Sequence, residues 1–435
     1  MSLTKIKKHW DCTEEEWNDW KWQLENSITD AEQLQKMFSI SEEEVEEINE
    51  ARNIFPMSIT PYYASLIDFN NENCPVKYQS VPRKAELMNC SYEMDDPLHE
   101  DEDSPVNGLT HRYPDRVLLL VTNRCSMFCR HCTRKRKVGD DVEKVEWKQI
   151  KKGIKYIKNT PRVRDVLLSG GDPLLMQTED LKEIITSLYA IPHVEVVRLG
   201  SRIPVVLPQR ITDELVEMLK EVNKDMGPVW LNTHFNHEKE LTDMSKKALA
   251  KLADAGIPLG NQTVLLRDVN DCPEIIKNLM HKLVQNRVRP YYLYQCDLSR
   301  GIEHFRTPIS KGIEIMEHLI GHTSGFSIPR FVVDAPGGGG KIPLTPNYLL
   351  SHSNRKTILR NFEGNICVYT EPEDQSCDCP PECTICDNPL EDEMGSQEVG
   401  LQQLYSEDND TISLQHSERD YGGNGNNGDD EKENE

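Results

Sequence analysis

The sequence predicts an α/β protein built around an incomplete barrel of about six β/α repeats. Residues 111–345 alternate short apolar runs with amphipathic segments of helical period, a pattern typical of parallel strands joined by helices. Three clustered cysteines follow the first apolar run, where such barrels carry their chemistry. The chain has 435 residues, 37% of them hydrophobic, so it can bury a large core.

Residues 1–110 are expected to form a helical N-terminal region. Thr13 and Glu16 match a capping box, and so a helix is expected to begin there. Its apolar residues recur at helical spacing and predict one packing face, formed by Trp17, Trp20, Leu24 and Ile28. Ser41, followed by three glutamates, predicts the start of a second, acidic helix.

The barrel elements are predicted within residues 111–345. The expected strands are residues 116–122, 165–169, 194–199, 229–233, 260–266, 289–294 and 331–334. The expected helices include residues 142–158, 179–188, 211–220, 245–255 and 273–285.

Two further segments are predicted after the barrel: a C-terminal zinc-binding segment over residues 346–390 and an acidic, disordered tail over 391–435. The net charge is −23, but residues 371–435 contain twenty acidic and two basic residues, so the remainder carries about −5. This balance gives no support for nucleic-acid binding. We find no signal-peptide pattern or apolar run of membrane-spanning length, and we expect a cytoplasmic protein without a membrane partner.

The strongest motif is the C-x3-C-x2-C spacing of Cys125, Cys129 and Cys132. Iron–sulfur clusters normally take four cysteines, so three would leave one iron of a [4Fe–4S] cluster open to another ligand. Three clustered cysteines can also belong to a zinc site or to an ordinary buried core. The spacing and its place after a strand favour the cluster.

A second motif lies far along the chain, where four glycines at residues 337–340 precede Lys341. Glycines let the backbone approach a ligand closely, and lysine forms Schiff bases with carbonyl cofactors. Ile342 follows the lysine, so the run does not match a phosphate-binding P-loop. A flexible hinge with an incidental lysine is the alternative interpretation.

Together these motifs resemble the lysine 2,3-aminomutases, which are radical S-adenosylmethionine (SAM) enzymes that also use pyridoxal phosphate. The resemblance covers about residues 10–385. It includes the runs at residues 60–63, 96–101, 104–106, 109–116, 169–172, 202–210, 230–237, 260–262, 294–297 and 303–308.

The resemblance implies a role for each matching residue. Cys125, Cys129 and Cys132 would hold the [4Fe–4S] cluster, and Lys341 would bind pyridoxal phosphate. The remaining cofactor contacts would be Ser169, Gly170, Gly171, Asp172, His234 and Gln262 for SAM, and Arg112, Tyr113 and Arg116 for the pyridoxal phosphate group.

For the substrate, the resemblance implies that Arg134 holds the carboxylate and that Asp297 and Asp334 receive the distant ammonium of L-lysine. The expected reaction is the interconversion of L-lysine and L-β-lysine, by an isomerase that moves the amino group through radical chemistry. An aminomutase for arginine or glutamate is one alternative, and a non-catalytic iron–sulfur electron carrier is another. Lys341 argues against the carrier. The expected partners are an electron donor such as flavodoxin or ferredoxin and further copies of the chain.

The resemblance also implies a structural zinc site near the end of the chain. Relatives bind zinc through a C-x-C-x2-C run and a distant cysteine that matches Cys272. Here Cys377 and Cys379 fit, but the third position is either Cys383 or Cys386, and four local cysteines could also close the site without Cys272. We favour Cys272, Cys377, Cys379 and Cys383.

Overall fold

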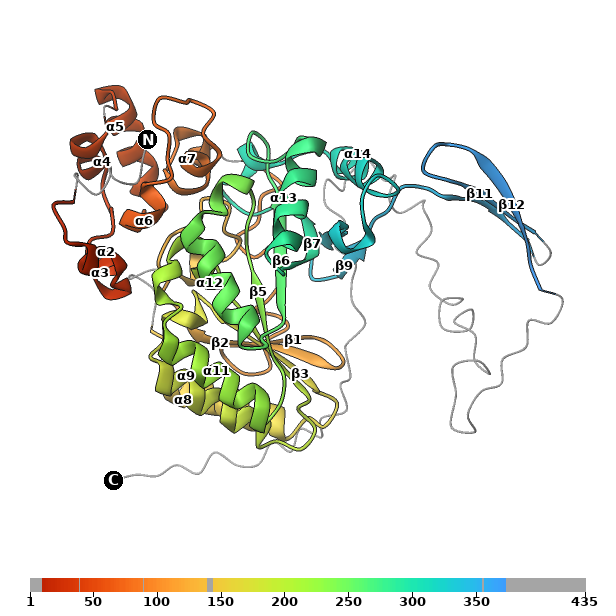
Figure 1. The fold of residues 1–435 in the computed structure, drawn as a ribbon, viewed down its shortest axis with the longest axis horizontal. Helices are drawn as coiled ribbons and strands as arrows, with labels where there is room; N and C mark the ends of the chain where they lie inside the picture. The colour runs from red at the N-terminus through yellow and green to blue at the C-terminus, as the bar shows by residue number, and fades with distance from the viewer. Residues whose placement is uncertain (1–9, 39, 89, 139–143, 354–355, 373–435) are drawn as a thin grey trace. The chain divides into compact units, whose positions relative to one another are not determined.

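The computed structural model describes residues 10–372, except for residues 39, 89, 139–143 and 354–355. Its core is a nine-stranded sheet whose strands follow one another in chain order (Figure 1). The described residues fall in two compact units, one that reaches Leu344 and one that begins at Thr345. Within this part of the chain, no helix is long and apolar enough to cross a membrane.

Seven parallel strands form the centre of the sheet, and one antiparallel strand flanks each edge. The strands are β1 (Leu109–Tyr113), β2 (Arg116–Thr122), β3 (Asp165–Gly170), β4 (Val196–Gly200), β5 (Val229–Thr233), β6 (Leu259–Leu265), β7 (Arg289–Gln295), β8 (Arg330–Ala335) and β9 (Gly340–Pro343). The seven predicted strands correspond to β2–β8 and differ from them by at most two residues at an end. The predicted incomplete barrel is confirmed.

Helices cover the outer face of the sheet. They are α8 (Trp147–Lys158), α9 (Thr178–Tyr189), α10 (Ile203–Val206), α11 (Asp213–Asp225), α12 (Asp243–Asp254), α13 (Pro273–Gln285) and α14 (Ile309–Leu319). The bounds of α13 agree with the prediction, whereas α11 runs five residues further and α8 begins five residues later than predicted.

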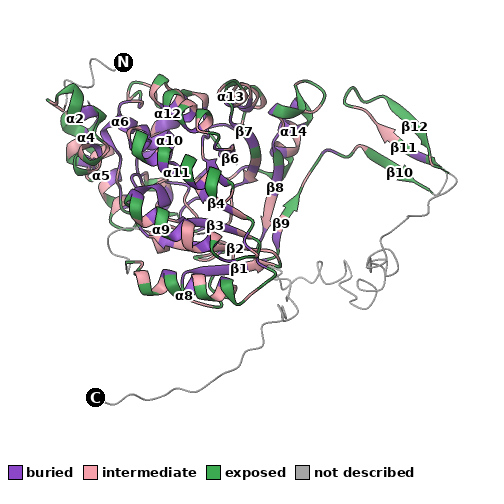
Figure 2. Ribbon diagram, turned by 60° about the horizontal axis from the view of Figure 1, so that its bottom comes forward, coloured by how far each residue is buried: buried purple, intermediate pink, exposed green. Residues whose placement is uncertain are grey.

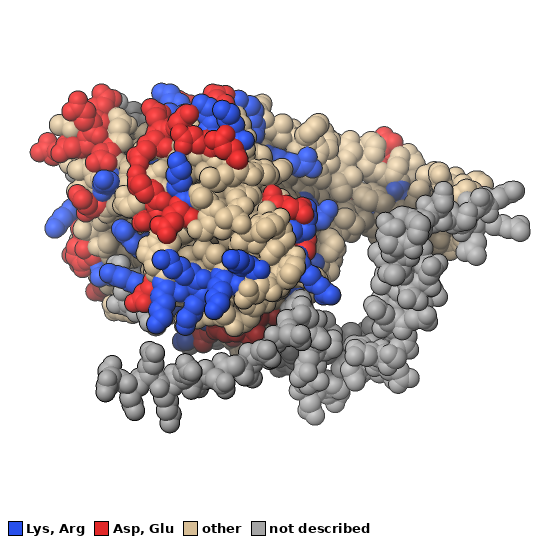
Figure 3. All heavy atoms as spheres, turned by 90° about the horizontal axis from the view of Figure 1, so that it is seen from below, with Lys and Arg blue, Asp and Glu red and all other residues tan. Residues whose placement is uncertain are grey.

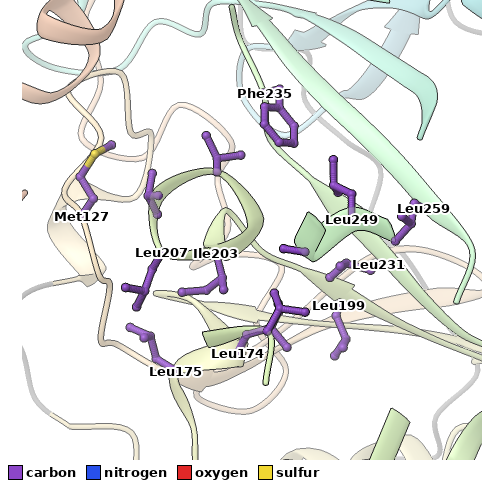
Figure 4. Packing of buried hydrophobic residues seen from close by; sticks show 14 of the residues in the cluster. Met127, Leu174, Leu175, Leu199, Ile203, Leu207, Leu231, Phe235, Leu249 and Leu259 are labelled. Atoms are coloured by element: carbon purple, nitrogen blue, oxygen red, sulfur yellow. The ribbon is translucent and has the colours of Figure 1, made fainter. Parts of the chain in front are cut away.

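The strand register aligns one leucine from each of five neighbouring strands. These leucines, Leu119, Leu168, Leu199, Leu231 and Leu259, pair successively across β2–β6 and are at most 6% exposed. Figure 4 shows three of them among other buried side chains. Because side chains alternate along a strand, the residues between the leucines face the inside of the barrel. The hydrophobic core therefore lies between the outer face of the sheet and the helices, and the inner face of the sheet can carry polar side chains.

The N-terminal region packs on the barrel through buried aromatic residues. Tyr62 and Tyr63 are fully buried, and their hydroxyls bond Thr242 and Glu240. The helices are α2 (Glu14–Asn18), α3 (Trp20–Glu25), α4 (Ala31–Met37), α5 (Glu42–Arg52), α6 (Pro61–Ala64) and α7 (Pro75–Ser80). The predicted capping box at Thr13 is confirmed at the start of α2, and the acidic helix predicted to begin at Ser41 is α5, which also starts with a capping box.

The prediction of one helix from Trp17 to Ile28 is wrong. Asp19 has extended backbone angles and separates α2 from α3, because its side chain accepts the Lys21 N–H and caps the second helix. Ile28 lies beyond α3 and pairs with Ile59 in an isolated bridge.

The outer helices of the barrel carry charges of both signs. Lys182 of α9 pairs with Glu221 of α11, and Asp213 of α11 pairs with Lys251 of α12. Figure 3 shows acidic and basic side chains interspersed over the face that it displays. This mixture agrees with the small net charge of the barrel region.

The second unit contains a three-stranded antiparallel sheet of β10 (Leu349–His352), β11 (Lys356–Arg360) and β12 (Ile366–Thr370). Its strands are mostly exposed (Figure 2). Many of the exposed residues are apolar, namely Leu349, Leu350, Ile358, Phe362, Ile366, Val368 and Tyr369. An exposed apolar sheet of this kind is typical of a surface that another chain covers.

Candidate active site

The three cysteines of the C-x3-C-x2-C motif lie in the loop that follows β2. All three thiols are free and half-buried. β2 is the first parallel strand of the barrel, so its carboxyl end brings this loop to the same rim as the loops after β3–β8.

Two glycines at the end of β3, Gly170 and Gly171, fix the start of the cysteine loop. Gly171 N donates to Thr122 O and Asp172 N donates to Arg124 O, each at 2.7 Å. A Cβ on Gly170 would lie 2.0 Å from Thr122 O, and one on Gly171 would lie 2.0 Å from Arg124 O. Only glycine allows this approach of two backbones, so the pair positions the cysteines.

The cysteine thiols are suited to a cationic centre. Burial and then the neighbouring cysteines raise the pKa of Cys125 well above its usual range, and burial followed by Cys129 raises the pKa of Cys132. A metal centre would offset both effects, since a coordinated thiol is deprotonated outright. No three cysteine, histidine or carboxylate groups in the described ranges come close enough to ligate one metal ion. A [4Fe–4S] cluster does not need that proximity, because it binds each cysteine at a different iron.

The inside of the barrel contains a cavity of about 690 Å³ that opens among the loops at the carboxyl ends of the strands and also reaches Arg116 and Asp165 at the amino ends of β2 and β3. It contains the three cysteines and every other predicted cofactor or substrate residue of the barrel. These lining residues are Arg112, Tyr113, Arg116, Cys125, Cys129, Cys132, Arg134, Ser169, Gly170, Gly171, Asp172, His234, Gln262, Asp297, Asp334 and Lys341. The structure thus brings together groups from nearly the whole barrel sequence.

Asp172 is engaged within the protein. Its carboxylate accepts Ser201 Oγ and Arg202 N, both at 2.7 Å, and Leu174 N at 3.1 Å. Burial raises the pKa of Asp172 to about 6. The side chain therefore ties the loop after β3 to the loop after β4, beside the cysteine loop.

His234 forms a stacked pair with His131. The ring centroids are 5.2 Å apart and the two Nε2 atoms are 3.0 Å apart, with Asn236 Nδ2 within hydrogen-bond distance of both. Burial and the nearby Arg202 lower the pKa of His234 to about 3, so the imidazole is neutral at pH 7. Because Nε2 is engaged by His131 and Asn236, Nδ1 is the ring nitrogen left to bond a guest in the cavity.

Lys341 lies opposite Asp334 on the antiparallel strands β9 and β8. Its Nζ is 3.0 Å from Asp334 Oδ1 and 5.2 Å from the ring centroid of Tyr294. The backbone N of Lys341 donates to Tyr113 OH at 3.0 Å. Gly340 has a φ of +83°, and a Cβ there would lie 3.2 Å from the same hydroxyl. The glycine run thus cradles the predicted cofactor lysine against Tyr113.

Asp297 adds a second carboxyl group to this end of the cavity. Loss of hydration, then the charge of Asp334, raises the pKa of Asp297 to about 7 despite the opposing effect of Lys341. Two carboxylates that disfavour each other's ionisation are suited to a cationic guest.

Arg134 is held by a glutamate that the sequence reasoning did not select. Arg134 Nη2 is 2.6 Å from Glu100 Oε1, and Nη1 donates to Ser169 Oγ at 3.2 Å. Despite burial, Arg134 lowers the pKa of Glu100 to about 2. Glu100 lies in a shared motif, but nothing in that motif indicates its ion-pair partner.

The predicted phosphate-binding residues already have protein partners. Arg112 bonds Asp103 at 2.7 Å and also the carbonyl of Leu98. Arg116 pairs with Asp115 at 3.0 Å and stacks over Tyr113, with the guanidinium 3.9 Å from the ring centroid.

Only one of the predicted zinc ligands, Cys272, lies within the described residues. Cys272 is exposed and precedes α13. Cys377, Cys379, Cys383 and Cys386 lie outside the described residues.

Comparison with known proteins agrees with this site. The family model for the radical SAM superfamily matches residues 119–280, and the one described as lysine-2,3-aminomutase matches residues 316–434. L-lysine 2,3-aminomutase of Acetoanaerobium sticklandii is 59% identical, over 89% of this chain and 92% of its own. That of Clostridium subterminale is 58% identical, over 86% and 89%. Glutamate 2,3-aminomutase of Clostridioides difficile is 45% identical, over 83% and 85%.

An open α/β barrel with its cysteine loop after the first parallel strand, matched by the superfamily model, defines a radical SAM enzyme. Enzymes of this class bind SAM at a [4Fe–4S] cluster. Because relatives with well over half of their residues identical cover nearly its whole described length, the chain belongs to the lysine 2,3-aminomutase family. The predicted resemblance is confirmed.

Proposed function

We propose that this enzyme interconverts L-lysine and L-β-lysine as an isomerase. One observation carries the choice of substrate: Asp297 and Asp334 face the cavity that also contains the cysteine loop and Lys341. A lysine molecule has an ammonium at the end of its side chain for the two aspartates and a carboxylate for a guanidinium at the other end.

The residues present fit the family's cofactors. Cys125, Cys129 and Cys132 would hold the cluster, and Lys341 would hold pyridoxal phosphate. SAM would lie against the strand ends that carry Ser169, Gly170, Gly171, Asp172, His234 and Gln262, and the phosphate of pyridoxal phosphate near Arg112, Tyr113 and Arg116. When bound, these groups supply a carbon-centred radical and a carrier for the migrating nitrogen.

The protein's own charges favour a diammonium substrate. The side chain of Asp334 is only 6% exposed and has Lys341 Nζ as its charged hydrogen-bond partner. If that nitrogen is taken up by pyridoxal phosphate, Asp334 and Asp297 lose their nearest ammonium. The substrate's distant ammonium can then replace it. A glutamate side chain would instead add a third carboxylate to the pair.

Arg134 is suited to orient the other end of the substrate. Glu100 holds one edge of its guanidinium, so its direction is fixed before the substrate enters. Nη1 lies nearest Ser169 and would be shared with the substrate carboxylate.

Three features of the proposal concern partners and zinc. Reduction of the cluster requires an electron donor such as flavodoxin or ferredoxin. The exposed apolar sheet of β10–β12 supports assembly into a homo-oligomer.

We retain Cys272, Cys377, Cys379 and Cys383 as the zinc ligands.

The test is an anaerobic assay of the cluster-loaded enzyme with SAM, pyridoxal phosphate and dithionite. L-lysine, L-arginine and L-glutamate are offered separately, and products are identified by NMR. β-Lysine formed from lysine alone is the expected result. Formation of β-arginine or β-glutamate in place of β-lysine would overturn the proposed substrate. Absence of SAM cleavage with all three amino acids would favour the electron carrier.

A further inference from the structure

Arg202 places a buried guanidinium against one of the cysteines of the motif. Its Nη1 donates to Cys129 Sγ at 2.8 Å, and the residue is 8% exposed. Arg202 follows β4, and its backbone N donates to Asp172 Oδ2 at 2.7 Å. Asp172, whose own backbone N holds the cysteine loop at Arg124 O, therefore also fixes the backbone of Arg202.

Three acceptors hold the far side of the guanidinium. Nη2 donates to Gln79 Oε1 at 2.6 Å and to Glu240 Oε1 at 2.8 Å, and it lies 3.3 Å from Tyr63 OH. Glu240 is fully buried, and its other oxygen accepts two backbone N–H groups from the loop after β5. Arg202 cannot turn away from Cys129 without leaving a buried carboxylate unpaired.

The charge on Arg202 is permanent. Arginine stays protonated in proteins, and here the buried carboxylate of Glu240 pairs with the guanidinium. Cys129 therefore faces a fixed cation as well as an N–H donor. Hydrogen bonds to cysteine sulfur and local charge are two of the means by which a protein sets the potential of an iron–sulfur cluster.

We infer that Arg202 is a positioning residue that raises the reduction potential of the [4Fe–4S] cluster through Cys129. A reduced cluster carries one more negative charge than an oxidised one, so a fixed cation at a ligand sulfur stabilises the reduced form. Arg202 thereby eases entry of the single electron that starts each reaction. This inference rests on the proposed binding of the cluster by Cys125, Cys129 and Cys132.

A purely structural role is the competing explanation. In that case Arg202 only neutralises Glu240, and its loss would destabilise the protein without changing the potential of a loaded cluster. The two roles are separated by Arg202→Gln, which removes the charge, and Arg202→Lys, which keeps a charge but loses the planar set of donors. Tyr63→Phe is the matched control, because it disturbs the same network and leaves the cation in place.

The experiment uses the full-length, cluster-loaded protein. Iron and sulfide analysis and visible absorption measure loading, and an anaerobic redox titration followed by EPR gives the midpoint potential. For Arg202→Gln we expect the ratio of reduced to oxidised cluster at a fixed potential to fall about tenfold, which is 59 mV for one electron. A fall of about threefold is expected for Arg202→Lys, and no change for Tyr63→Phe.

A loaded Arg202→Gln protein with the wild-type potential would overturn the inference. If Arg202→Gln does not load a cluster, the midpoint potential of loaded Arg202→Lys is the test, and a wild-type potential in that variant would also overturn the inference. A shift in Tyr63→Phe equal to that in Arg202→Gln would favour the structural role. The potential is measured without substrate, so failure to turn over lysine would count against the proposed reaction and not against the role of Arg202.

Discussion

Asp334 and Lys341 form a 3.0 Å ion pair across the edge of the sheet, where β8 and β9 run antiparallel. The pair joins the predicted substrate-binding carboxylate to the predicted cofactor lysine. Asp297 is the second acid here, and its raised pKa reflects burial and the charge of Asp334. This end of the cavity therefore balances two acids against one amine, and its chemistry depends on which cation is present.

Asp297→Asn should lower kcat/KM for L-lysine about 100-fold, on the order of 3 kcal/mol, because the substrate ammonium loses a desolvated partner. Steady-state kinetics of the cluster-loaded variant measure the effect. Asp213→Asn, at a 93% exposed side chain on α11, is the control and should match the wild type. A wild-type kcat/KM in Asp297→Asn would contradict the assigned role.

The pKa of Asp297 near 7 predicts a pH dependence for substrate capture. The ionised carboxylate attracts the ammonium, so protonation below pH 7 should weaken binding. kcat/KM for lysine should fall as the pH drops from 7, by up to about tenfold per pH unit, and level off above 7. Profiles between pH 6 and 8 for the wild type and for Asp297→Asn test this, since the variant should lack the inflection. An inflection of equal size in the variant would assign it to another group.

Parallel strands and the cysteine loop were predictable from the sequence because both depend on local pattern. A parallel strand of the barrel reads as a short apolar run, and C-x3-C-x2-C is a contiguous motif. The break at Asp19 was missed because the helical spacing of the apolar residues continues through it. α14 was not among the predicted helices, because it contains Gly312 and a glycine inside a helix weakens the helical signal. In the structure this glycine is needed because a Cβ there would lie 2.1 Å from the ring of Phe331.

The partners of the site residues could not be predicted in the same way. Glu100 reaches Arg134 from a loop before β1, and Arg202 reaches Cys129 across 73 residues of sequence. Such pairs depend on how loops from different strands meet at the rim. The motifs identified which residues belong to the site, but only the structure shows which of them hold one another.

Glu100→Gln should lower the free energy of unfolding at pH 7 by about 3 kcal/mol. The folded-state pKa of Glu100 is about 2, below its usual 4.5, so its stabilisation is complete above pH 4.5 and is lost as the pH falls toward 2. Thermal unfolding of the wild type and the variant should therefore differ most at neutral pH and converge in acid. Glu102→Gln, at a 79% exposed side chain, is the control. A difference that stays constant from pH 7 to pH 4 and below would contradict the ion pair as its source.

Gly171→Ala should abolish most cluster loading, because the new Cβ would lie 2.0 Å from Arg124 O and push the cysteine loop away from β3. Displacement of a reacting group by about 1 Å can cost about 100-fold in rate, so lysine turnover should fall by at least that factor. Iron content and turnover of the variant measure both effects. Gly325→Ala is the matched control, because a Cβ there meets no atom within 4 Å. Full iron content in Gly171→Ala would show that the loop tolerates the shift, and the glycine pair would then need another explanation, such as direct contact with SAM.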